Sequence, residues 1–165
     1  MGSRERIAVF LSDFDLQVNE IEKVYERLEK KSSLLQSSSP TSEVVESAGY
    51  WLHNLYNALE DLFQLIAGFW ENTLDDRGLY HRSLLRRMRL EIEGIRPALL
   101  REEMFQHIDE LRGFRHVFRH AYSYGLDDKR VQLLLGRVLR NKEGLMNDLQ
   151  LFRSRIQELR DAPEE

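Results

Sequence analysis

The segment from 111 to 122 concentrates side chains that can bind phosphate and transfer protons. It has the sequence LRGFRHVFRHAY, with three arginines, two histidines and a tyrosine. Arginine is always charged and planar, which suits the negative charge of a phosphate in a trigonal-bipyramidal transition state. Histidine can accept and return a proton near neutral pH. These residue types therefore favour phosphodiester chemistry.

A helical wheel divides this segment into two faces. With about 100° per residue from Arg115, the polar side chains occupy one arc between about −20° and about 140°. The other members of the arc are Arg112, His116, Arg119, His120, Tyr122 and Ser123. The apolar residues face the opposite way and can anchor the helix in a core. Arg115 and His120 lie about 140° apart, which predicts that a second protomer completes the site.

The cations of this arc repel one another, because like charges three or four residues apart destabilise a helix. No Asp or Glu lies between Arg112 and Tyr124 to offset them. A polyanionic partner explains such a face. RNA carries its own nucleophile, the 2′-hydroxyl, so a proton acceptor and a cation are enough to cleave it. The arc thus favours a metal-independent ribonuclease that needs no cofactor.

Other interpretations of the same residues stay open. Any one histidine or arginine on a helix can simply be solvated. His116 and His120 are four residues apart and could ligate a metal, but no third ligand accompanies them and the arginines oppose a cation. A second stripe, Arg82, Arg86 and Arg89, either contacts RNA or is a solvated face paired with Glu91 and Glu93.

Apolar spacing predicts helices along most of the chain. Residues recur at three- and four-residue steps over about 7–28, 43–72, 80–93, 104–124 and 128–159. Polar, proline or glycine breaks separate these segments, with Ser42 as the expected cap of the second and Gly125 as the end of the fourth. We find no alternating strand pattern and no glycine-rich phosphate loop. The expected fold class is an all-α, four-to-five-helix up-and-down bundle.

Length and composition limit the protein further. At 165 residues we expect a single domain over 1–165, with a core from about 5 to 160 and a frayed tail at 161–165. The chain has no cysteine, which excludes disulfides and thiol catalysis. Its net charge of −4 argues against nucleic-acid binding on average, but arginines crowd its middle. Without a secretory leader or a long apolar run, we expect a cytoplasmic protein with no membrane contact.

The motif also resembles a known family. Arg115, four residues, His120, Ala121 and Tyr122 resemble the Arg-x4-His-x-Tyr motif of HepT toxins in the HEPN superfamily, and the resemblance spans about 79 to 131. It implies a HEPN-type bundle and a homodimer whose two motif helices form one ribonuclease cleft. By this resemblance Arg115 and His120 are catalytic.

The resemblance implies partners as well. HepT toxins belong to type VII-like toxin–antitoxin systems, in which a minimal nucleotidyltransferase (MNT) antitoxin neutralises the toxin by AMPylation, here on Tyr122. Transfer RNA is a candidate substrate. The expected RNA contacts are Arg82, Arg86, Arg89, Arg112, His116 and Arg119. His116 departs from the asparagine often found after the motif arginine, and Arg119 from a small or apolar residue. The alternative function is a non-catalytic helical module that binds a nucleotidyltransferase or another partner.

Overall fold

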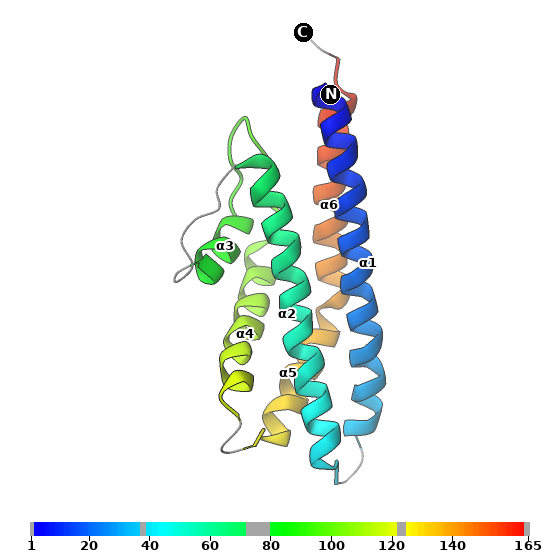
Figure 1. The fold of residues 1–165 in the computed structure, drawn as a ribbon, viewed down its shortest axis with the longest axis vertical. Coiled ribbons are helices and arrows are strands. Elements are labelled where there is room, and N and C mark those ends of the chain that lie inside the picture. Colours follow the sequence, from blue (N-terminus) through cyan, green and yellow to red (C-terminus); the bar gives the residue numbers. More distant parts are fainter. Residues whose placement is uncertain (1, 37–38, 72–79, 122–124, 164–165) are drawn as a thin grey trace.

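The computed structural model describes residues 2–36, 39–71, 80–121 and 125–163. These residues form six α-helices: α1 Ser3–Leu35, α2 Ser42–Trp70, α3 Tyr80–Met88, α4 Glu102–Arg119, α5 Asp128–Arg140 and α6 Lys142–Asp161. In Figure 1, α1 and α4 run opposite to α2 and α6, and the start of α1 lies beside the end of α6 at one end of the bundle. Outside the helices, the described residues form one isolated β-bridge, between Ile92 and Arg96, and no strand. The predicted all-α bundle is confirmed.

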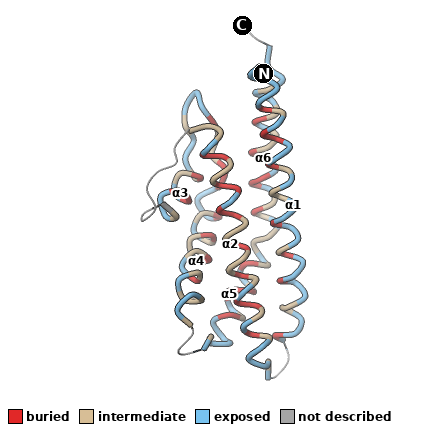
Figure 2. Tube along the Cα trace, viewed as in Figure 1, coloured by how far each residue is buried: buried red, intermediate tan, exposed pale blue. Residues whose placement is uncertain are grey.

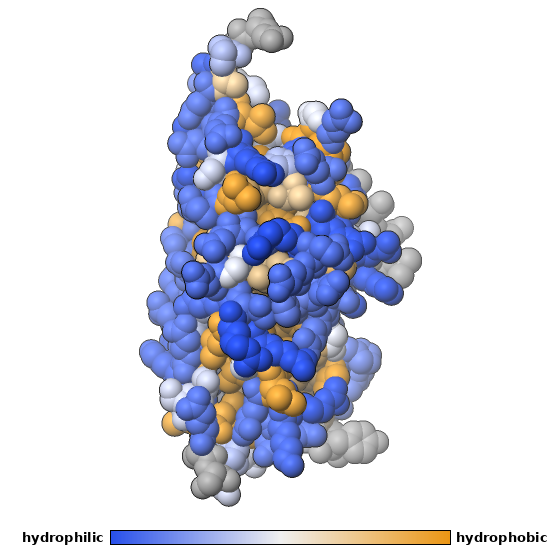
Figure 3. All heavy atoms as spheres, turned by 180° about the vertical axis from the view of Figure 1, so that it is seen from behind, coloured by the Kyte–Doolittle hydropathy of each residue, from blue (hydrophilic) through white to orange (hydrophobic). Residues whose placement is uncertain are grey.

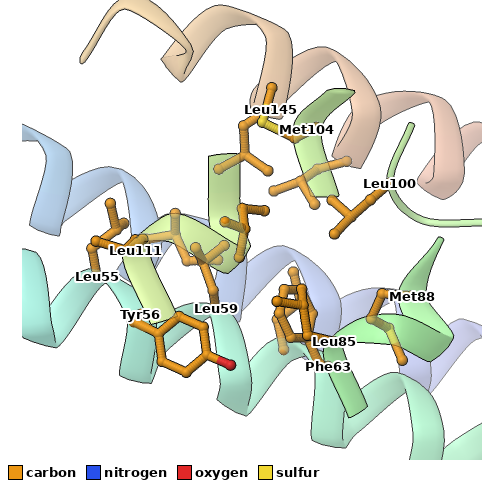
Figure 4. Close-up of a cluster of buried hydrophobic side chains, with 14 of the residues drawn as sticks. Leu55, Tyr56, Leu59, Phe63, Leu85, Met88, Leu100, Met104, Leu111 and Leu145 are labelled. Atoms are coloured by element: carbon orange, nitrogen blue, oxygen red, sulfur yellow. The ribbon is translucent and has the colours of Figure 1, made fainter. Parts of the chain in front are cut away.

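The core lies where α2 meets its neighbours. Helix α1 packs against α2 and α6, and α2 also contacts α3, α4 and α5. Buried residues follow one side of each long helix (Figure 2), as the apolar spacing predicts. In Figure 4, Leu55, Leu59 and Phe63 of α2 face Leu85 of α3 and Leu111 of α4. The back of the molecule is mostly hydrophilic, with hydrophobic residues in separate patches (Figure 3). Helix α2 is therefore the element on which the others are assembled.

The start of α2 differs by one residue from the expected cap. The side chain of Thr41, not that of Ser42, accepts a hydrogen bond from the backbone N–H of Val44, at 3.4 Å. Ser42 is instead the first helical residue. Either hydroxyl can cap a helix, so the sequence alone did not separate them.

The single last helix expected from the sequence is wrong, because the chain forms α5 and α6 with a break at Asn141. The side-chain amide of Asn141 donates to the carbonyl of Arg137 at 2.8 Å, and its backbone N–H donates to the same carbonyl at 3.1 Å. Asparagine side chains compete with helical hydrogen bonds in this way. The structure therefore has one helix more than the upper number expected.

Helix α3 ends at Met88, earlier than the expected Glu93, because its last carbonyl is taken by a distant segment. The backbone N–H groups of Leu99 and Leu100 donate to the Met88 carbonyl at 2.8 and 3.0 Å. Gly94 adopts φ 71°, which a side chain rarely tolerates, and allows the tight turn between Ile92 and Arg96. The segment after α3 is thus a compact turn rather than a helical extension.

None of the helices in the described part of the chain is both long enough and apolar enough to cross a membrane.

Candidate active site

The two motif residues of α4 occupy different environments. The Arg115 side chain is only 15% exposed, and its Nη1 lies 3.3 Å from Oε1 of Glu60 on α2. His120 is exposed, caps the end of α4, and its ring centroid lies 4.4 Å from that of His116. Among the described residues, no hydrogen bond or ion pair joins Arg115 to His120. Within one chain, Arg115 is instead paired with Glu60 on α2.

Glu60 is the centre of a cluster that joins three helices. Its side chain is buried, with 7% exposed, although it carries a charge. Both of its carboxylate oxygens lie 2.7 Å from Nδ1 of His81 on α3. Nη1 of Arg115 lies 3.3 Å from one carboxylate oxygen and 3.3 Å from His81 Nδ1. A buried charge is costly unless it is paired, so His81 of α3 and Arg115 of α4 offset the cost of burying the Glu60 carboxylate.

This cluster was not predicted from the sequence, although one signal was present. Glu60 lies four residues after Tyr56 and three before Phe63, so it interrupts the apolar face of α2. A glutamate in that position has to find a cation on a facing helix. His81 carried no such signal, because it lies in the first turn of a short helix whose orientation local spacing does not define.

Tyr56 forms the wall of the cluster on the α2 side. The Arg115 guanidinium carbon lies 5.8 Å from the centroid of the Tyr56 ring, within cation–π distance. Burial raises the pKa of Tyr56, and the Glu60 carboxylate raises it further. Nε of Arg115 is buried and has no hydrogen-bond partner among the described residues. The hydrogen bonds of Arg115 to Glu60 therefore come from Nη1 and not from Nε.

The end of α4 is held against α2 by close packing. A Cβ on Gly49 would lie 2.6 Å from Cδ1 of Leu126 and 3.2 Å from Cδ2 of Phe118. Because glycine has no Cβ, the side chains of Leu126 and Phe118 can pack directly against α2 at this position. The ring of His53, one turn further along α2, stacks on Phe118 at 5.3 Å between centroids. These contacts position the residues that directly precede His120.

Burial lowers the pKa of His53, and Arg115 and Arg119 lower it further. The folded protein therefore binds this proton less tightly than the unfolded chain, whose histidine pKa is about 6.5. The contribution of His53 to the free energy of unfolding is therefore fully present above about pH 6.5 and declines as the pH falls below it. A His53→Phe variant keeps the stacking on Phe118 and should show a weaker decline in the free energy of unfolding. Urea unfolding at pH 7.5 and pH 5 tests this; equal declines in both proteins would contradict it.

The predicted RNA contacts divide into exposed and internally paired residues. Arg82, Arg86, His116 and Arg119 are exposed. Arg112 donates from Nε to Asp109 at 2.8 Å. Their contact with RNA stays a prediction.

Arg89 has a different partner from those expected. Its Nη1 donates to the carboxylate of Glu102 at 2.9 Å, and its guanidinium lies 4.5 Å from the centroid of Phe105. Glu91 and Glu93, the predicted partners of this stripe, are both exposed. Arg89 thus links the end of α3 to the start of α4.

Tyr122, the predicted AMPylation site, lies outside the described residues, as do Ser123 and Tyr124. The expected end of the fourth helix at Tyr124 is wrong, because α4 ends at Arg119. In the part of the chain that the structure describes, no three His, Asp or Glu side chains are grouped to hold a metal ion.

The fold and the cluster define the class of protein: an antiparallel helical bundle with a motif arginine anchored to a buried carboxylate. The chain belongs to the family of HepT-like proteins, whose model matches residues 47–156. The match includes most of α2, all of α3, α4 and α5, and most of α6. It confirms the family predicted from Arg115 to Tyr122 and extends well beyond the motif. No curated protein and no solved structure matches the chain.

Proposed function

We propose that this HepT-like chain is the toxin of a type VII-like HEPN/MNT toxin–antitoxin system and acts as a metal-independent endoribonuclease, with transfer RNA as a candidate substrate. The observation that carries the proposal is the Arg-x4-His pair of α4 inside the family match. The exposed residues around it, His116 and Arg119, extend a cationic surface beside the motif. A cationic surface of this kind supports binding of a phosphate backbone.

The proposed reaction uses the 2′-hydroxyl of RNA as the nucleophile. His120 accepts the 2′-hydroxyl proton as the 2′-oxygen attacks phosphorus, and the bond to the 5′-oxygen breaks. The leaving 5′-oxygen takes a proton from the protonated His120, directly or through water, and the products are a 2′,3′-cyclic phosphate and a 5′-hydroxyl. Arg115 stabilises the extra negative charge on the phosphorane.

We propose a homodimer as the active form. Within one chain Arg115 turns toward Glu60 while His120 is exposed, which supports a site built from Arg115 of one protomer and His120 of the other. The cognate MNT-type nucleotidyltransferase would then neutralise the toxin by AMPylation of Tyr122, which adds negative charge and bulk beside the motif.

A second function is favoured by one observation. Arg115 is mostly buried and paired with Glu60, an arrangement that also suits a purely structural arginine. In that case the chain is a non-catalytic module that docks a nucleotidyltransferase or another partner.

Expression and RNA cleavage by the His120→Ala variant separate the two functions. We expect wild-type protein to arrest growth and to cleave transfer RNA in vitro, and His120→Ala to do neither. His107→Ala is the matched control, because His107 lies on α4 about three and a half turns before His120, at about 3.6 residues per turn. Equal cleavage by His120→Ala and wild type would exclude the proposed mechanism, and intact RNA with wild-type protein would favour the docking module.

A mixing experiment tests the composite site. Coexpressed Arg115→Ala and His120→Ala chains form mixed dimers in which one of two composite sites keeps both residues. Cleavage should return in the mixture although each variant alone is inactive. Absence of recovery in a mixed dimer verified by tags would exclude a shared site.

A further inference from the structure

The hydrogen bonds of the buried Glu60 carboxylate are unequal. Both oxygens lie 2.7 Å from Nδ1 of His81, whereas Nη1 of Arg115 lies at 3.3 and 3.5 Å from them. Charge-assisted hydrogen bonds usually measure about 2.7–2.9 Å, so only the contact with His81 has the length of a strong one. His81 therefore sets the orientation of Glu60, and Arg115 adapts to it.

The chemistry of the pair defines which group donates. An ionised carboxylate only accepts, so Nδ1 of His81 carries the hydrogen and donates to both oxygens of Glu60. Nη1 of Arg115 lies 3.3 Å from the same Nδ1, and two donors cannot bond to each other. The guanidinium is consequently restricted to the flank of the carboxylate, between His81 and the ring of Tyr56.

We infer that His81 is a positioning residue for Arg115 and acts through Glu60. With its donor in place, the carboxylate holds Nη1 of Arg115 and leaves Nη2 of the guanidinium for a phosphate. Without that donor, Glu60 can rotate and form a shorter bond with Arg115, which draws the guanidinium away from the substrate. The inference rests on the proposed ribonuclease function for its catalytic consequence, but not for the geometry itself.

Two amide substitutions at His81 test this role. The side-chain amide of asparagine lies close to where Nδ1 lies in histidine, whereas that of glutamine reaches farther, toward the Nε2 position. We expect His81→Asn to cleave RNA at nearly the wild-type rate, and His81→Gln and His81→Ala to lose roughly 10- to 100-fold in kcat with KM little changed, since misplacement of a catalytic group by an ångström has effects of this size. Ser83→Ala, an exposed change on the same helix, is the control.

The pH profile separates positioning from proton transfer. His81→Asn cannot titrate, so a profile of the wild-type shape supports positioning, and loss of activity in a folded His81→Asn protein overturns it. Wild-type cleavage rates in both His81→Gln and His81→Ala also overturn it.

A measurement without RNA keeps this inference distinct from the proposed function. The NMR signal of the Arg115 Nε–H group reports how firmly the guanidinium is held. We expect the wild-type signal in His81→Asn and a shifted or broadened one in His81→Gln. An unchanged signal in His81→Gln would overturn the positioning role even if the protein cleaves no RNA. Conversely, cleavage that survives Arg115→Ala and His120→Ala would overturn the ribonuclease mechanism and leave this result standing.

Discussion

Replacement of Arg96 by alanine is expected to lower the free energy of unfolding by about 3–5 kcal/mol, because it deprives a buried carboxylate of its buried cation. Arg96 is 2% exposed. Its Nε donates to Oε1 of Glu71 at 2.8 Å, and the Glu71 side chain is itself only 4% exposed. The guanidinium also donates to the carbonyls of Arg87, Leu90 and Pro97 at 3.0–3.1 Å. Alanine removes all of these donors.

Urea unfolding at pH 7 measures this loss. Arg96→Lys should recover only part of it, because a single ammonium cannot reach the carboxylate and three carbonyls at once. Arg140→Ala, an exposed arginine on α5, is the control and should change the free energy by less than about 0.5 kcal/mol. A loss below about 1 kcal/mol for Arg96→Ala would mean that Arg87, which also pairs with Glu71, is sufficient by itself.

Arg115→Ala is expected to lower kcat/KM for RNA cleavage by roughly 100- to 1000-fold, the usual effect of removing a group that stabilises a developing oxyanion. Arg115→Lys keeps the charge but loses the planar fork and should be intermediate. Stability should change much less than activity, because Glu60 keeps its two 2.7 Å contacts with His81.

Cleavage of a labelled transfer RNA under single-turnover conditions measures the loss of activity. Thermal unfolding in parallel measures the change in stability. Arg137→Ala is the control, an arginine on α5 whose side chain is 49% exposed and paired with Glu110. Unreduced cleavage by folded Arg115→Ala would remove Arg115 from the catalytic mechanism. A large loss of stability together with unreduced cleavage would make it a structural arginine.

The helices were predictable where local information is sufficient. The apolar spacing of 43–72 gave nearly the observed α2, because one stripe of a helix must face the core. The ends of α3 and α4 and the break at Asn141 were not predicted. Each of them depends on hydrogen bonds that the spacing of apolar residues does not report, such as those from Leu99 and Leu100 to Met88.

The candidate site was predictable only in part. The wheel separated Arg115 from His120 by about 140°. In the structure the Arg115 side chain is mostly buried, and His120 is exposed just after the end of α4. The wheel also assigned Arg115 and Arg112 to one solvent-facing arc. It could not show that Arg115 turns toward Glu60, which lies 55 residues away along the chain.

The sequence by itself determined the class of fold, the two-faced character of α4 and the family, because these depend on neighbours within a few turns of one helix. Only the tertiary structure decided that Glu60, His81 and Arg115 share one charge cluster. The physical reason is burial. A carboxylate removed from water must be neutralised by whatever cations the packing of α3 and α4 brings to it, and that packing is a property of the whole bundle.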